Sequence, residues 1–196
     1  MAYLDGDIPY DDRLMELFNA VDTMETIGYH PNNVKYIKKI YVNHKNNTVK
    51  IEVRDYRENP MMLQIANMDI KTLSGKTEYF YPNGKLFSTM NVKNGVLDGE
   101  AKLYYENGKL KSIVYYKNDR IDGIVEYDKS GKLLHKSIFE NGTGDWKLYW
   151  SNGKVSEEGK YVSGRKDGVW KKYREDGSLD TILKYDNGRL LSEKWQ

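Results

Sequence analysis

Short runs of alternating apolar and polar residues, each following a turn, occupy most of the chain. In the stretch after Gly108, for example, Leu110, Val114 and Tyr116 lie on alternate positions with polar neighbours between them. A period of two is typical of a β-strand with one buried face. The five turns read Asn83-Gly84, Asn107-Gly108, Ser130-Gly131, Asn152-Gly153 and Asp176-Gly177. Because such pairs supply the positive φ values of a type I′ turn, the sequence predicts a β-hairpin at each.

The hairpins form an internal repeat of about 24 residues. A second glycine series marks the start of each unit: Gly75, Gly99, Gly123, Gly144 and Gly168. The third unit is short, because it lacks one residue before Gly131 and two between Gly142 and Gly144. A lone hairpin is barely stable, whereas stacked hairpins share continuous ladders of side chains. We therefore expect a mainly β fold, an elongated antiparallel sheet of stacked β-hairpin repeats.

Two columns of larger side chains run through the first strands of the repeats. One column consists of Phe80, Tyr104, Tyr127, Tyr149 and Tyr173, and the other of Thr77, Ala101, Val125, Trp146 and Trp170. The columns are three residues apart, except at Val125 and Tyr127 in the shortened unit, so strict alternation would place them on opposite faces of the sheet. If both point into the core, a bulge or a sharp twist in each first strand would reconcile the two columns.

The first 73 residues do not follow the repeat, and we expect a small α+β capping region over 1–73, followed by the repeats over 74–196. Apolar residues at helical spacing, from Leu14 to Met24, predict a helix that ends near Gly28. Alternating residues over 34–42 and 49–54 predict a hairpin, and 61–73 a further strand. This region would cover the first edge of the repeat sheet.

The composition favours binding over catalysis. Thirty-one basic and 29 acidic residues leave a net charge of +2, so the chain as a whole has no field that favours nucleic acid. It contains no cysteine, its three histidines lack a metal-ligand spacing, and no phosphate-binding loop is present, so we expect no enzyme activity, metal or cofactor. Neither a signal peptide nor a membrane-spanning apolar run is visible, which predicts a cytoplasmic protein without membrane insertion, unless a leader has been removed.

Seventeen tyrosines are the unusual feature of the composition. Aromatic residues and arginine that fall outside the inferred core columns are candidates for binding a protein partner, since interface hot spots are rich in these types. The candidates are Tyr81, Tyr105, Tyr115, Trp150 and Arg174. The alternative is that a two-sided sheet packs both faces, or that these are ordinary scattered surface aromatics.

The unit from Gly144 to Lys154, Gly-x-Trp-x-x-Tyr-x-x-Asn-Gly-Lys, resembles the variant MORN repeat of bacteria, and the resemblance covers residues 75 to about 190. Proteins built from these repeats are similar to the YwqK-like antitoxin or immunity family that accompanies polymorphic toxins. The resemblance implies a non-catalytic protein that neutralises a cognate toxin by direct binding. The alternative that it leaves open is an adhesin- or envelope-associated scaffold that binds proteins or surface polymers.

Overall fold

The computed structural model describes residues 23–29, 35–55 and 62–196, and within these ranges the chain forms β-strands and turns with no helix. The strands are β1 (Thr23–Tyr29), β2 (Lys35–Asn43), β3 (Thr48–Asp55), β4 (Met62–Asp69), β5 (Ser74–Phe80), β6 (Leu86–Lys93), β7 (Val96–Leu97), β8 (Gly99–Tyr104), β9 (Leu110–Lys117), β10 (Arg120–Tyr127), β11 (Leu133–Ile138), β12 (Gly144–Tyr149), β13 (Val155–Val162), β14 (Arg165–Tyr173), β15 (Leu179–Asp186) and β16 (Arg189–Trp195). The expected mainly β fold of stacked antiparallel hairpins is confirmed.

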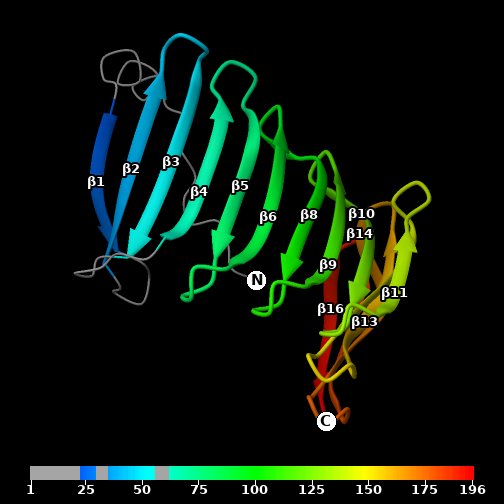
Figure 1. Cartoon of the computed structure of the whole chain (residues 1–196). Coiled ribbons are helices and arrows are strands. Elements are labelled where there is room, and N and C mark those ends of the chain that lie inside the picture. The colour runs from blue at the N-terminus through cyan, green and yellow to red at the C-terminus, as the bar shows by residue number, and fades with distance from the viewer. Residues whose placement is uncertain (1–22, 30–34, 56–61) are drawn as a thin grey trace.

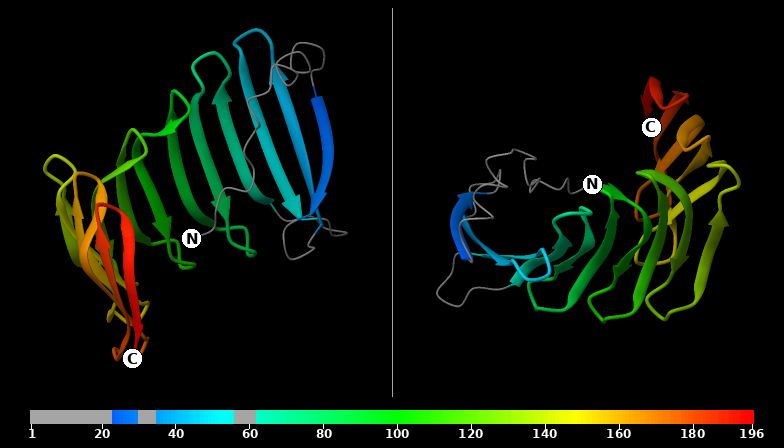
Figure 2. Two further views of the ribbon diagram at one scale, coloured as in Figure 1. Left: turned by 180° about the vertical axis from the view of Figure 1, so that it is seen from behind. Right: turned by 90° about the horizontal axis from the view of Figure 1, so that it is seen from above.

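The strands form two sheets instead of one. The first sheet has 11 strands, β1 to β11 in chain order, with the short β7 beside β6. The second has five strands, β12 to β16. Figure 1 shows β1 to β6, β8 and β9 standing side by side, and both views of Figure 2 show the second sheet turned away at the far end.

The N-terminal strands continue the repeat sheet. The expected hairpin is confirmed as β2 and β3, and the further strand as β4, which pairs with β5. The expected helix is wrong where the structure describes it: Met24 to Gly28 lie in β1, which pairs with β2. Pairing with an open sheet edge has outweighed the helical spacing of the apolar residues there, as tertiary context often does. The rest of that helix falls outside the described residues, and the domain boundary at residue 73 stays a prediction.

Each repeat contains a bulge, but it lies in the second strand of the hairpin, so the expected bulge in the first strand is wrong. The register shifts at the start of the tyrosine column in every unit, as between Lys172 and Tyr173. The residue that is skipped lies in the second strand each time: Phe87, Lys111, Leu134, Ser156 and Asp180. Between the two columns the first strands therefore keep their alternation, and Trp170 and Tyr173, three apart, lie on opposite faces. The expectation that both columns point into one core is wrong.

We name the two faces of the sheets by these columns. The Trp face carries Ala101, Trp146 and Trp170 with the cross-strand partners of these residues, and the Tyr face carries Tyr104, Tyr149 and Tyr173. The side chains of Trp146 and Trp170 are buried, whereas the tyrosines are half-buried. The Trp face therefore supplies the core.

Trp170 is the centre of this core and is fully buried. Tyr161 packs edge-on against it with ring centroids 5.2 Å apart, and the Lys166 ammonium lies 3.7 Å from its ring centroid. The cluster around it unites side chains of both sheets: Val114, Ile124, Phe139, Trp146, Tyr161, Trp170 and Leu183. The two sheets are thus held together by their Trp faces through apolar burial.

The two sheets separate at the shortened third unit because a pairing segment is missing. Between Gly164 and Gly168 three residues begin β14, and all three pair with β13: Arg165 opposite Val162, Lys166 opposite Tyr161 and Asp167 opposite Lys160. Between Gly142 and Gly144 only Thr143 remains. The described chain there forms one isolated bridge, Glu140 to Thr143, and β12 starts a new sheet.

The residue that is missing before Gly131 shifts the register of the third unit. Ile124, instead of Val125, lies opposite Val114 on the Trp face and is fully buried. Val125 lies opposite Ile113 on the other face. The sequence-based column that included Val125 is therefore wrong at this position.

Candidate functional site

Four of the five predicted partner-binding residues form a column at the turns, where each donates a hydrogen bond to a backbone oxygen 22 or 23 residues further along the chain. The bonds join Tyr81 Oη to Tyr104 O (2.7 Å), Tyr105 Oη to Tyr127 O (2.9 Å), Trp150 Nε1 to Tyr173 O (2.9 Å) and Arg174 Nη2 to Gln196 O (2.9 Å). Different side chains thus perform the same task at equivalent positions. We call these four residues the staple column.

The Asn-Gly-Lys turns reinforce this link. The amide of Asn107 donates to Lys129 O at 3.1 Å, and the ammonium of Lys109 donates to Ser130 O at 2.7 Å. Asn152 and Lys154 make the same two bonds one sheet further on. The repeated triplet therefore does more than shape its own hairpin, because it also satisfies backbone carbonyls of the next one.

The residues of the staple column differ in burial and in the contacts that they make within the chain. Tyr105 is only 6% exposed, so its expected place outside the core is wrong, and burial raises the pKa of its hydroxyl. Arg174 is exposed but also pairs with Asp180 at 2.9 Å. Tyr81 packs edge-on against Phe87 with centroids 5.0 Å apart. Partner binding by these residues stays a prediction. Their hydrogen bonds to backbone oxygens of a later strand could not be predicted from the local sequence.

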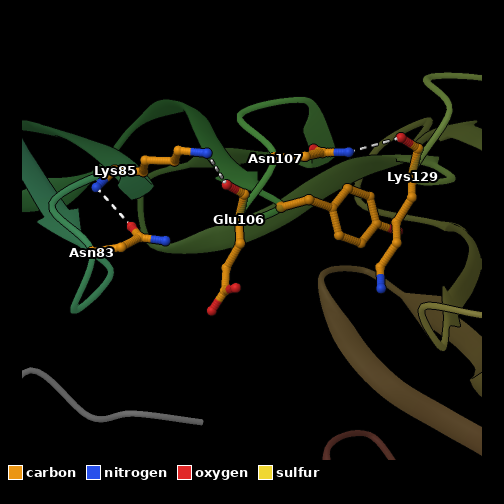
Figure 3. A pocket seen from close by; sticks show the side chains of 6 residues that line it. Asn83, Lys85, Glu106, Asn107 and Lys129 are labelled. Carbon is orange, nitrogen blue, oxygen red and sulfur yellow. Dashed lines mark hydrogen bonds between the residues drawn. The ribbon is translucent and has the colours of Figure 1, made fainter.

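An open hollow of about 400 Å³ lies between the first three turns. It is lined by Asn83, Lys85, Tyr105, Glu106, Asn107 and Lys129. Figure 3 shows the Lys85 ammonium and the Asn107 amide directed at backbone oxygens of the neighbouring turns. Most of the polar groups of this hollow that could orient a ligand are therefore already used to hold the turns together.

The fifth candidate, Tyr115, lies elsewhere, on the Tyr face of the first sheet. Its cross-strand neighbours are Glu100 in β8 and Gly123 in β10. Gly123 has no side chain, and Ile138 lies over it, since a Cβ atom added at Gly123 would be 3.3 Å from Ile138 Cδ1. Ile138 itself is 55% exposed.

Apolar, aromatic and charged side chains meet around Tyr115. Ile113 lies opposite Lys102, and the Lys102 ammonium pairs with the Glu100 carboxylate at 2.7 Å. Tyr104 and Tyr115 are close enough to raise the pKa of Lys102 electrostatically. The hydrogen bond to Glu100 is the main reason that the pKa of Lys102 is raised. We call the set Lys102, Tyr104, Ile113, Tyr115 and Ile138 the Tyr115 patch. Its mixture of tyrosine and aliphatic side chains beside a charge is typical of protein interfaces.

Exposure differs between the two faces. Three of the most exposed aliphatic residues, Leu133, Ile138 and Val169, all lie on the Tyr face, opposite Tyr127, Gly123 and Lys184 respectively. Their exposed fractions lie between 51% and 55%. On the Trp face, the edge strand β16 also exposes Trp195, which is 68% exposed opposite Thr181. Away from β16, these exposed aliphatic side chains gather on the Tyr face, which is therefore available to a partner. Sequence reasoning did not find Leu133 or Val169, because assigning the tyrosine column to the core also misassigned its neighbours.

Other kinds of site are not evident in the described ranges. No group of three or more histidine, aspartate or glutamate side chains is placed there to hold a metal ion. No described helix is long and apolar enough to cross a membrane.

Comparison with known protein families identifies repeats of a known type in four segments of the chain. The model of the MORN repeat variant matches four segments, residues 73–94, 97–118, 143–163 and 166–187. Between the second and third of these lies the shortened unit at which the sheets separate. MORN repeats indicate a repeat-based binding scaffold and are generally non-catalytic. No curated protein matches the chain.

Proposed function

We propose that the protein binds another protein through the Tyr115 patch and that it acts as an antitoxin or immunity protein, neutralising a cognate toxin by covering it. The single observation that supports this proposal is the difference in burial between the two faces of the sheets. The Trp face is buried in the core, while the Tyr face presents apolar and aromatic side chains on paired strands.

A flat surface on hydrogen-bonded strands suits stoichiometric binding. Little side-chain entropy is lost when half-buried tyrosines that are already held in a sheet meet a partner, and tyrosine is enriched in interface hot spots. The neutralisation role rests on the resemblance to the antitoxin family together with this surface. It requires no catalytic group.

The test is co-expression of the chain with the product of the adjacent gene. We expect the neighbour to be toxic alone, to be tolerated with the wild-type chain, and to co-purify with it. Tyr115→Ala should weaken the complex by about 2 kcal/mol, roughly thirtyfold in Kd, as a hot-spot tyrosine does. Tyr41→Ala, on the same face but distant in β2, is the matched control and should leave binding unchanged.

Two results would count against the proposal. A neighbour that binds but has no toxicity would favour the alternative of an adhesin- or envelope-associated scaffold. Equal losses of binding in the two tyrosine variants would remove the Tyr115 patch as the contact surface.

A further inference from the structure

Six asparagines of the chain are followed directly by glycine, and one of these Asn-Gly steps differs from the others in its hydrogen bonds. The six are Asn83-Gly84, Asn94-Gly95, Asn107-Gly108, Asn141-Gly142, Asn152-Gly153 and Asn187-Gly188. Asparagine is chemically labile before glycine, because the glycine backbone nitrogen can attack the side-chain amide carbon with no Cβ atom in the way. All six asparagines are exposed, so exposure does not distinguish them.

The glycine N–H, which must lose its proton before the nitrogen attacks, is hydrogen-bonded in five of the six steps. Three glycines donate within their own turn, to the carbonyl oxygen three residues earlier: Gly84, Gly108 and Gly153. Gly95 donates to Leu73 O at 2.9 Å, and Gly188 donates to Lys166 O at 2.8 Å. Gly142 donates to no atom of the residues that the structure describes.

The unpaired N–H of Gly142 follows from the break between the two sheets. In the equivalent turns this N–H reaches a carbonyl oxygen 22 residues earlier, as Asp119 does to Leu97 O and Gly164 to Gly142 O. Such a bond requires that the preceding unit lie alongside in the same sheet. Residues 141 and 142 lie where the chain leaves the first sheet for the second, so the Gly142 carbonyl is bonded but its N–H is not.

The side chain of Asn141 is unbonded as well. In four of the steps the asparagine side chain forms a hydrogen bond: Asn83, Asn107, Asn152 and Asn187. Within the described ranges the side chains of Asn94 and Asn141 form none. These two asparagines have φ values of 54° and 51°, and the glycines after them 80° and 72°. Asn94 is therefore a matched comparison, in which the glycine N–H is bonded.

We infer that Asn141 is a site of spontaneous covalent modification, at which the asparagine is converted into aspartate and isoaspartate. Hydroxide removes the proton from Gly142 N, which attacks Cγ of Asn141. A bond forms between these two atoms, the Cγ–Nδ2 bond breaks, and ammonia leaves with a proton from water. A second water molecule opens the succinimide at either carbonyl carbon. The net reaction consumes one water and releases one ammonia, with no oxidant or cofactor.

The modification would act on the connection between the two sheets. Isoaspartate adds a methylene group to the backbone between Glu140 and Gly142, and either product adds a negative charge. Glu140 and Thr143 exchange two backbone hydrogen bonds across this turn, at 3.0 and 2.9 Å. Phe139, just before the turn, is buried in the core cluster that unites the sheets. The inference does not depend on whether the protein binds a partner.

The test incubates the full chain in mildly alkaline buffer made with heavy-oxygen water and follows each Asn-Gly step by peptide mass spectrometry. In the folded protein Asn141 should react at least about fivefold faster than Asn94, equivalent to about 1 kcal/mol, as expected for one backbone hydrogen bond. In concentrated urea the two should react at similar rates, because Gly95 then loses its bond to Leu73 O. Asn141→Gln should abolish the reaction at this turn and leave that at Asn94 unchanged.

The rates in the wild-type chain decide the inference, and circular dichroism checks that the Asn141→Gln variant is folded. A preference for Asn141 that disappears in urea supports it. If Asn94 or any other Asn-Gly step reacts as fast as Asn141 in the folded protein, the inference is overturned. The same preference in urea as in the folded chain also overturns it, because the local sequence and not the unpaired N–H would then set the rate.

Discussion

Glu126 in β10 lies directly opposite His135 in β11, at the place where the two sheets separate. Glu126 is 1% exposed, and neither its two carboxyl oxygens nor His135 Nε2 has a hydrogen-bond partner of acceptable geometry in the described chain. The equivalent position before the bulge is leucine in the second and fourth units, Leu103 and Leu148. The buried carboxyl of Glu126 at the junction of the two sheets therefore distinguishes the shortened unit from these two units.

The first prediction concerns pH. Burial raises the pKa of Glu126 from 4.5 to about 8, against the opposing influence of Lys111, Ser112 and the Tyr149 backbone. Between these values the folded protein holds a proton that the unfolded chain has released, so the free energy of unfolding falls as pH rises, and it levels off above about 8. Glu126→Gln should abolish this slope and stabilise the protein at pH 8 by a few kcal/mol, measured by urea denaturation at a series of pH values.

Two further measurements make the pH prediction specific. At pH 4.5 the variant and the wild type should be nearly equal in stability, because the carboxyl is then protonated in the folded protein. Glu158→Gln, which changes a carboxylate of lowered pKa, should instead destabilise the protein at pH 7. A wild-type protein whose stability rises between pH 5 and 8 would show that another group dominates.

The second prediction concerns the staple column. Tyr105→Phe removes only the hydroxyl that donates to Tyr127 O and should lower the free energy of unfolding by about 1 kcal/mol. Tyr105→Ala also removes a buried ring and should cost about 3 kcal/mol. Thermal denaturation compares them with Tyr115→Ala, which should change stability least. If Tyr105→Ala were as stable as the wild type, the column would be free for binding after all.

The third prediction concerns close packing beneath the central indole. A Cβ atom added at Gly159 would overlap the ring atoms of Trp170, which is fully buried and cannot move aside. Gly159→Ala should therefore destabilise the protein by about 2 kcal/mol or more. Gly168→Ala meets no atom within 4 Å but has a φ of +68°, so only backbone strain of about 1 kcal/mol should appear. Equal stabilities of the two variants by chemical denaturation would contradict this packing.

The fourth prediction concerns the break between the sheets. Inserting Arg-Lys after Thr143 restores the three residues found between Gly164 and Gly168 and should allow β12 to pair with β11. Hydrogen exchange followed by mass spectrometry should then show slower exchange in β11. The same insertion after Gly153 lengthens a turn and should leave β11 unchanged. Unchanged exchange in β11 of a folded Thr143 insertion variant would mean that the core cluster, not the connection length, sets the break.

The bulges and the staple column show which features of the fold the local sequence pattern can and cannot predict. The spacing of glycines and alternating residues predicts the hairpins, because turns depend on the backbone conformation of a few neighbouring residues. It led us to expect a bulge in the first strand, whereas the second strand carries the extra residue. The position of the extra residue places Tyr173 on one face of the sheet and Trp170 on the other. It therefore also determines which side chains are exposed. Tyr115 could be proposed from its parity, whereas Leu133 and Val169 required the observed register.

The amino-acid sequence by itself determined the repeat, the turns and the antiparallel order of the strands, since φ preferences and the period of two act over short distances. Only the tertiary structure decided that a deletion of two residues divides one sheet into two, that their Trp faces share a core, and that Glu126 is enclosed between them. These outcomes depend on contacts between units about 24 residues or more apart, whose packing no local pattern encodes.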